Sequence, residues 1–186
     1  VMAARQAAQL TRCALHVVPT ESLPQGIAAG LAYNPDEDVA SNAAAMEAAR
    51  QEVTTVEVTR AATDRTAEGI AVRRGQAIAL VDGRLVAAGD DVVDALLAGL
   101  VHAGADGASL VTIYAGGDCS PADADRAAAS VRTAFPDIEV EQVRGGQPLY
   151  PLIASLEREP RARRLTRAAS TAAFGRGEPW QRIARR

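Results

Sequence analysis

Three short clusters of carboxylates are the residues of this sequence that are best suited by type to hold a metal ion. They are Asp36-Glu37-Asp38, Asp90-Asp91 and Asp123/Asp125. Carboxylate oxygens are ligands that Mg²⁺ prefers. Each cluster also stands at the start of a predicted helix, where unpaired backbone amides and the helix dipole stabilise acidic side chains. We therefore interpret the clusters as helix-start acids and predict no metal site.

The residues needed for covalent or phosphoryl chemistry are not assembled in the sequence. The two histidines, His16 and His102, fall in a predicted strand and a predicted helix, and no serine has a histidine and carboxylate pair nearby. A phosphate-binding loop needs a lysine, and this chain contains none. Its paired glycines, in "GGD" and "RGGQ", do not make the G-x-G-x-x-G pattern of a dinucleotide site. The chain looks catalytically empty, and we predict no cofactor bound to it.

Two polar loops remain as candidate binding elements. "VVPTESLPQG" follows a predicted strand and opens a predicted helix, the position where α/β sheets place ligand crevices. It offers Thr20, Ser22, Gln25 and Gly26, and the alternative is a capped, proline-stiffened connector. "GGQPLYPL" holds a glutamine directly before one proline and a tyrosine between two prolines, which is typical of a rigid interface anchor. Its candidates are Gly145, Gly146, Gln147 and Tyr150. The alternative for this loop is a buried tyrosine that closes the core, and we expect Gln147 and Tyr150 to face the first loop.

The elements that would position these loops follow from periodicity and capping. "ARQAAQL" predicts a helix, "CALHVV" a buried strand, and "LPQGIAAGLAY" a helix with Ser22 or Leu23 near its cap. "PDEDVASNAAAMEAARQEV" predicts a helix with acids in its first turn. After Val53 the pattern alternates, "VDGRL" indicates a hairpin, and β-α-β-α-β follows, with Ser120 capping the second helix. The fold class is α/β, with α+β character after Val53.

Composition divides the chain at its C-terminal end. Before Arg158 there are 11 arginines against 21 acidic residues, and from Arg158 onward there are 9 arginines against 2 glutamates. We divide the chain into residues 1–52, a partial α/β unit, 53–157, a mixed-sheet α+β unit, and 158–186, an arginine-rich tail. Cys13 and Cys119 fit no disulfide framework, and no apolar run reaches the ~18 residues of a membrane span. These features predict a cytoplasmic location, with no nucleic-acid partner and no stable membrane insertion.

Four stretches resemble a known family when they are taken in order: "VVPTESLPQGIAAGLAYNP", "DGRLVAAG", "LVTIYAGGD" and "GGQPLYPLIASLE". They are similar to the C-terminal region of the ATP-binding subunit of DAK-like fatty acid kinases, which are related to dihydroxyacetone kinases. The resemblance covers Val1 to about Glu157. It adds Thr112 and Tyr114, from the third stretch, to the candidate partner- or ligand-binding residues.

The resemblance implies a DegV-like α/β unit whose first strand is missing from this chain, followed by the mixed-sheet unit. It also implies that a kinase domain holding Mg-ATP belongs to the parent protein and is absent here. We expect this chain to be the non-catalytic module that docks a DegV-type fatty-acid-binding protein, so that the parent can phosphorylate the acyl carboxylate. The alternatives are a fatty-acid or small-ligand binding module and a homodimerisation module.

Overall fold

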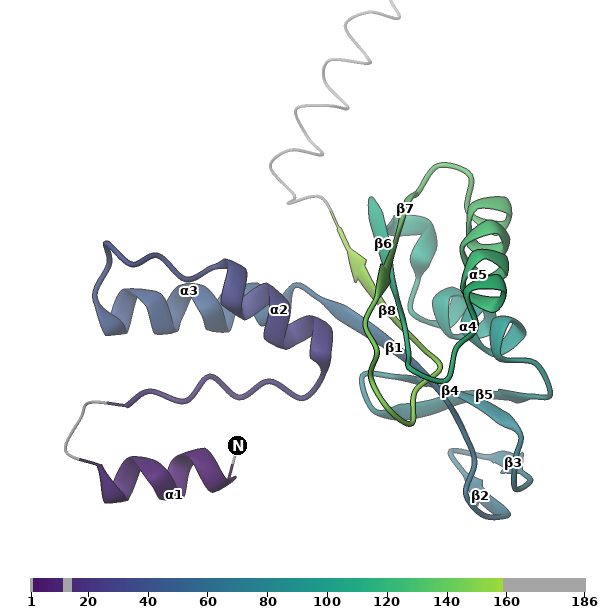
Figure 1. The fold of residues 1–186 in the computed structure, drawn as a ribbon, viewed down its shortest axis with the longest axis horizontal. Coiled ribbons are helices and arrows are strands. Elements are labelled where there is room, and N and C mark those ends of the chain that lie inside the picture. Colours follow the sequence, from purple (N-terminus) through teal and green to yellow (C-terminus); the bar gives the residue numbers. More distant parts are fainter. Residues whose placement is uncertain (1, 12–14, 159–186) are drawn as a thin grey trace, which may run out of the picture.

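The computed structural model describes residues 2–11 and 15–158 and shows two units (Figure 1). The first is a helical arm that projects from one side of the molecule. It contains α1 (Met2–Leu10), α2 (Leu23–Leu31) and α3 (Val39–Gln51). The second unit is built on a sheet and begins at β1, directly after Val53. The predicted α+β character after Val53 is confirmed. Residues 159–186 of the predicted tail lie outside the described residues.

The sheet unit combines eight strands, two α-helices and one short 3₁₀ helix. In chain order they are β1 (Thr54–Arg60), β2 (Arg65–Ala67), β3 (Ile70–Val72), β4 (Ala77–Val81), β5 (Arg84–Gly89), α4 (Val92–His102), η1 (Ala105–Gly107), β6 (Leu110–Ala115), α5 (Pro121–Ala134), β7 (Glu139–Arg144) and β8 (Leu152–Glu157). Six strands form one sheet in the order β5-β4-β1-β8-β6-β7, and β2 pairs with β3 separately. Only β6 and β7 are parallel in the main sheet, and α5 connects them.

The hairpin between β4 and β5 confirms the interpretation of "VDGRL". Asp82 and Gly83 form its turn with φ values of 47° and 78°, the two positive values that a type I′ turn requires. The Asp82 carboxylate accepts a hydrogen bond from the Thr55 backbone amide at 3.0 Å. The turn is therefore attached to the neighbouring strand β1.

Helices α4 and α5 pack on one face of the main sheet and enclose the core. Leu96 and Leu100 of α4 and Val131 of α5 are fully buried there, against Val56, Ile113 and Leu156 from three strands. We call the opposite side of the sheet the second face. It carries the alternate residues of the same strands, among them Thr55, Ser155 and Thr112.

The helix starts confirm the interpretation of the carboxylate clusters. Asp38 accepts a hydrogen bond from the Ser41 amide as the N-cap of α3, and Asp91 accepts from the Val93 and Asp94 amides as the N-cap of α4. Ser120 caps α5, as predicted, with its hydroxyl bonded to Asp123. One detail was wrong: α3 begins at Val39, so the acids precede its first turn because Asp38 is the cap.

A strand was predicted over Cys13–Val18, and this prediction is wrong for the described part. Residues 15–18 are extended but belong to no sheet. Their β-branched residues suit a strand, yet a strand also needs a neighbour that supplies backbone hydrogen bonds. The main sheet lies away from this segment (Figure 1), and the segment packs beside α2 and α3 instead.

The Asp91 cap predicts a pH-dependent contribution to stability. The Arg126 guanidinium, which donates to both Asp91 carboxylate oxygens at 3.1 and 3.0 Å, and the amides of the cap lower the pKa of Asp91. Because the folded-state pKa is depressed, this stabilisation is present above the unfolded-state pKa of about 3.9 and is lost as the pH falls through the folded-state value. We expect Asp91→Asn, which keeps a capping oxygen, to destabilise the protein at pH 7. The difference should vanish in urea titrations performed in acid, and a difference that persists at low pH would show that the charge is irrelevant.

Candidate functional site

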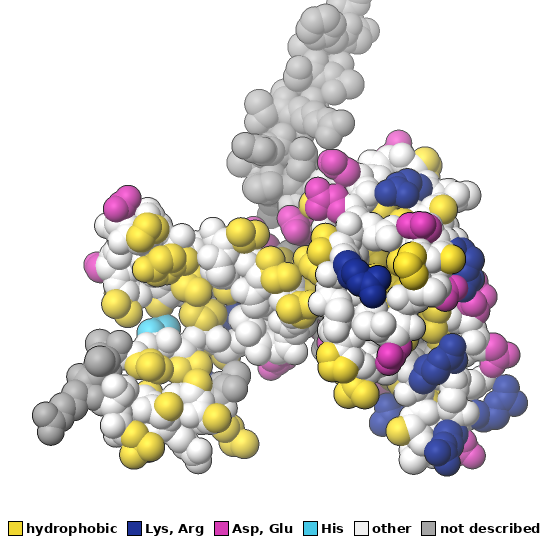
Figure 2. All heavy atoms as spheres, viewed as in Figure 1, with side chains coloured by type: hydrophobic (Ala, Val, Ile, Leu, Met, Phe, Trp, Pro, Cys, Tyr) yellow, Lys and Arg dark blue, Asp and Glu magenta, His cyan; other side chains and the backbone are white. Residues whose placement is uncertain are grey.

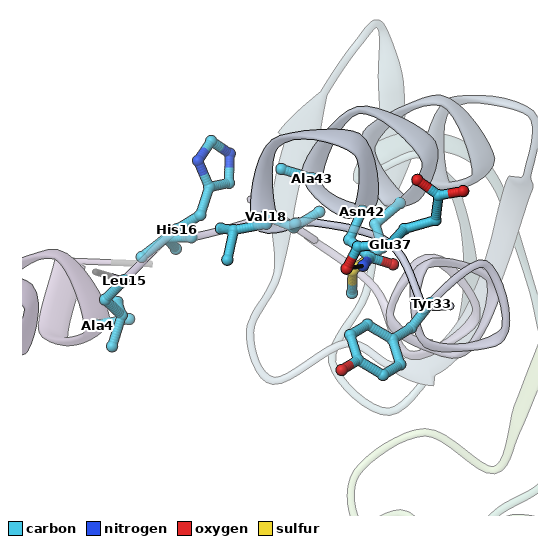
Figure 3. Close-up of a pocket in the computed structure, with 11 residues that line it drawn as sticks. Ala4, Leu15, His16, Val18, Tyr33, Glu37, Asn42 and Ala43 are labelled. Atoms are coloured by element: carbon cyan, nitrogen blue, oxygen red, sulfur yellow. Dashed lines mark hydrogen bonds between the residues drawn. The ribbon is translucent and has the colours of Figure 1, made fainter. Parts of the chain in front are cut away.

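An apolar hollow lies in the helical arm. It has a volume of about 530 Å³ and is lined by α1, the extended segment 15–18 and the α2–α3 hairpin (Figure 3). Its apolar lining includes Leu15, Val18, Tyr33, Val39 and Met46, and its polar lining consists of His16, Glu37 and Asn42. Such a surface suits an apolar partner or chain with a few polar contacts at its rim.

Asn42 holds the α2–α3 hairpin in the shape that forms this groove. Its side-chain oxygen accepts from the Asn34 amide at 2.7 Å, and its side-chain nitrogen donates to the carbonyl oxygens of Asn34, Glu37 and Asp38 at 2.8 to 3.1 Å. The residue is only 6% exposed, so water cannot readily replace these bonds. Asn42 was not among the residues predicted from the sequence. An asparagine inside an alanine-rich helix could have indicated a specific hydrogen-bonding role.

We expect Asn42→Ala to lower the free energy of unfolding by about 2 kcal/mol, because it leaves several buried backbone groups without a partner. Urea titration monitored by circular dichroism would measure the change. Gln51→Ala, an exposed change in the same helix, is the control and should cost less than about 0.5 kcal/mol. Equal stability of the two variants would contradict the anchoring role.

The first predicted loop acts locally as a helix cap. The Ser22 hydroxyl accepts from the Gln25 amide at 3.3 Å, and the Gln25 side chain accepts from the Glu21 amide at 2.9 Å. Pro24 lies in the first turn of α2. A β-carbon at Gly26 would lie 3.9 Å from the Thr20 hydroxyl oxygen, which is an ordinary contact distance. The capped connector is therefore confirmed, and a binding role for these residues stays a prediction.

The second predicted loop closes over the end of β6. The amides of Gly145 and Gly146 both donate to the Ala115 carbonyl at 2.9 Å. The Gln147 side chain donates to the Tyr114 carbonyl at 2.9 Å and to the Tyr150 carbonyl at 3.2 Å. The structure thus brings together Tyr114, Gly145, Gly146, Gln147 and Tyr150.

The expectation that Gln147 and Tyr150 face the first loop is wrong for Gln147. Its amide is turned into its own loop, because two backbone carbonyls there need a donor. The two loops also meet different ends of β1: Ser22 contacts Thr55 at 2.8 Å, whereas the Leu149 carbonyl accepts from Thr59 at 2.6 Å. Tyr150 is half-buried, so its role as an interface anchor stays a prediction.

Thr112 belongs to a row of hydroxyls that crosses the second face. Thr55, Ser155 and Thr112 are direct partners on β1, β8 and β6, and each is at most 5% exposed. Ser22 extends the row through its 2.8 Å contact with Thr55. The Ser155 hydroxyl and the Gln147 side-chain oxygen are buried without a hydrogen-bond partner among the described residues. In the next row of this face, burial and then the nearby Asp82 charge raise the pKa of Glu57.

Side chains that could bind a metal ion or take part in redox chemistry are not clustered in the described part of the chain. Within residues 2–11 and 15–158, no group of three or more histidine, cysteine, aspartate or glutamate side chains could hold a metal ion. Cys119 is a buried free thiol whose pKa is raised, chiefly by burial, and Cys13 lies outside the described residues. No helix in the described ranges has the length and apolar character to cross a membrane.

A protein-family model matches most of the chain and shows which family it belongs to. The model of the C-terminal domain of FakA-like fatty acid kinase proteins matches residues 1–157. The chain belongs to this FakA-like C-terminal family. The resemblance carried by the four sequence stretches is thereby confirmed, and the family match ends where the arginine-rich tail begins.

Individual relatives of this FakA-like family cover the same region. The chain is 33% identical over 159 residues to the uncharacterized protein SH1689 of Staphylococcus haemolyticus and 32% identical over 157 residues to protein YloV of Bacillus subtilis. Each match covers 84% of this chain but 28% of the relative. The chain therefore spans less than a third of the length of these curated relatives.

A solved structure is partly similar to this chain. It is the Streptococcus pneumoniae fatty acid kinase B3 protein loaded with linoleic acid, with a TM-score of 0.44 and 13% identity. The match covers 66% of this chain and 50% of that one.

Proposed function

We propose that this chain is a non-catalytic docking module of a fatty acid kinase, and that it binds the separate fatty-acid-binding protein through the apolar groove of the helical arm. The proposal also places the kinase domain, with its Mg-ATP, in another part of the parent protein. Membership of the FakA-like family supports the assignment to such an enzyme.

One observation carries the docking role. Of the eleven large apolar side chains that are exposed in the described residues, eight lie in the helical arm. Leu31 is 82% exposed, Val39 58% and Tyr33 57%, and the last two line the groove. Figure 2 shows apolar side chains gathered over this arm. A concentration of exposed apolar residues marks a surface that a partner covers.

The test is calorimetric titration of the full chain with the acyl-loaded fatty-acid-binding protein. We expect Tyr33→Ala to weaken binding roughly tenfold or more, because truncating an aromatic anchor typically costs about 1 to 3 kcal/mol. The melting temperature should change little, since the side chain is already exposed.

The matched control is Val101→Ser, which changes an apolar side chain of α4 that is 66% exposed and outside the groove. It should leave the affinity unchanged. A folded wild-type chain that fails to bind the fatty-acid-binding protein at tens of micromolar would refute the docking role. Sedimentation of the chain alone would then test whether the same apolar surface serves homodimerisation.

The unpaired Ser155 hydroxyl favours a second candidate, a small-ligand site that binds a carboxylate such as that of a fatty acid. Ser155 and Thr112 can each donate a hydrogen bond, and the N-terminus of α2 lies beside the row through Ser22. Oleate would be added to the purified chain, and its stabilisation of the fold measured. Ser155→Ala should abolish that stabilisation, whereas no stabilisation of the wild type would exclude this candidate.

A further inference from the structure

Three exposed glutamates flank strand β6 on the second face of the sheet. Leu110 of β6 pairs with Glu139 of β7 on one side and with Glu157 of β8 on the other, and Thr112 pairs with Glu141. Paired residues of adjacent strands point to the same side of a sheet. Glu139, Glu141 and Glu157 therefore share one surface with Thr112, and we call them the glutamate face. Figure 2 shows acidic side chains gathered over this end of the sheet unit.

The arginines of β1 and β7 do not lie on this face. Arg60 stands two residues after the inward Val58 of β1, and Arg144 of β7 pairs with the inward Ala115 of β6, so both lie on the face toward the helices. Arg158 is directed away as well, since it donates to Thr54 and to the Ala103 carbonyl at the end of α4. The ion pairs found among the described residues do not involve the three glutamates.

The same chain carries a strongly basic segment directly beyond this face. Residues 159–186 contain eight arginines against two glutamates, and they begin two positions after Glu157. Their structure lies outside the described residues. The family match ends at residue 157, so the segment lies outside the matched domain. The positive charge of segment 159–186, its position and its covalent connection to Glu157 make this segment the occupant that best fits the glutamate face.

We propose that the arginine-rich segment 159–186 docks on the glutamate face of its own chain. Arginine forks match carboxylates and can bind them in a bidentate manner. A single exposed ion pair contributes little to stability, so several pairs must act together. The short tether keeps the segment at a high effective concentration beside the face. This inference does not depend on the docking role of the helical arm.

Trp180 provides the measurement, because it is the only tryptophan of the chain and lies inside the segment. Its fluorescence anisotropy reports how freely the segment moves. We expect high anisotropy at about 10 mM salt and a marked fall at about 1 M, because the Debye length shortens from about 30 Å to about 3 Å. In Glu139→Gln/Glu141→Gln/Glu157→Gln the anisotropy at low salt should already be at the high-salt value.

A control variant with the same net charge distinguishes the effect of the glutamate face from the effect of total charge. Asp36→Asn/Asp94→Asn/Asp118→Asn removes three exposed acids that lie elsewhere, and it should keep the wild-type anisotropy. Equal anisotropy of the two triple variants would overturn the proposal. So would an anisotropy that rises with protein concentration between about 1 and 100 μM, since this would place the segment on a second copy instead.

Discussion

Gly116→Ala is expected to lower the free energy of unfolding by about 3 kcal/mol. A β-carbon on Gly116 would overlap the Tyr150 carbonyl oxygen and would lie 2.9 Å from the Gln147 carbonyl oxygen. Both neighbours are backbone atoms, which cannot rotate away. The loop would have to shift, and two hydrogen bonds of 2.9 Å would be strained, those from Gly116 to Pro151 and from Gly117 to Gln147. Urea titration would measure the loss.

Gly117→Ala is the matched control, one residue further along. The nearest atom to its added β-carbon is the Gly146 carbonyl oxygen at 3.4 Å, an ordinary contact. The variant should remain within about 1 kcal/mol of the wild type. If both variants were equally stable, the loop around Tyr150 would not be packed against this turn, and its candidate residues would not form one site.

Gly99→Leu is expected to cost about 3 to 4 kcal/mol, because α4 lies directly against the sheet at this glycine. A β-carbon there would be 2.5 Å from Val56 and 3.1 Å from Ala79, which belong to two neighbouring strands. The remaining atoms of leucine would have to push the helix outward from a filled core. Thermal and urea unfolding would both report the loss.

Gly30→Leu is the corresponding change at a glycine of α2 that is exposed and has open space around it. It should raise the stability of the helix by up to about 1 kcal/mol, because leucine favours a helix more than glycine does. Both substitutions replace a helical glycine by leucine. A loss of stability at Gly99 together with a gain at Gly30 would therefore show that packing, and not helix propensity, causes the loss. A loss at both positions would contradict the packing argument for Gly99.

The hydroxyl row, the glutamate face and the inward turn of Gln147 could be decided only by the tertiary structure. The hydroxyl row and the position of Glu157 in the glutamate face depend on β8, which lies between β1 and β6. Gln147 turns inward because it bonds the Tyr114 carbonyl at the end of β6 and the Tyr150 carbonyl of its own loop. The run "LIASL" is buried on both sides and lacks the alternation that indicates a strand, so its central place was not predicted. The groove likewise depends on how Asn42 ties α3 to the end of α2.

What the sequence by itself determined was local. The cap at Ser120, the helix-start position of Asp91, a cap at Ser22 or Leu23 and the turn at Asp82 were predicted because each requires contacts only a few residues away. The quoted motifs also identified the family that the comparison confirmed. The segment before Thr20 shows the limit: its residues favour a strand, but pairing requires a partner strand that local sequence does not reveal.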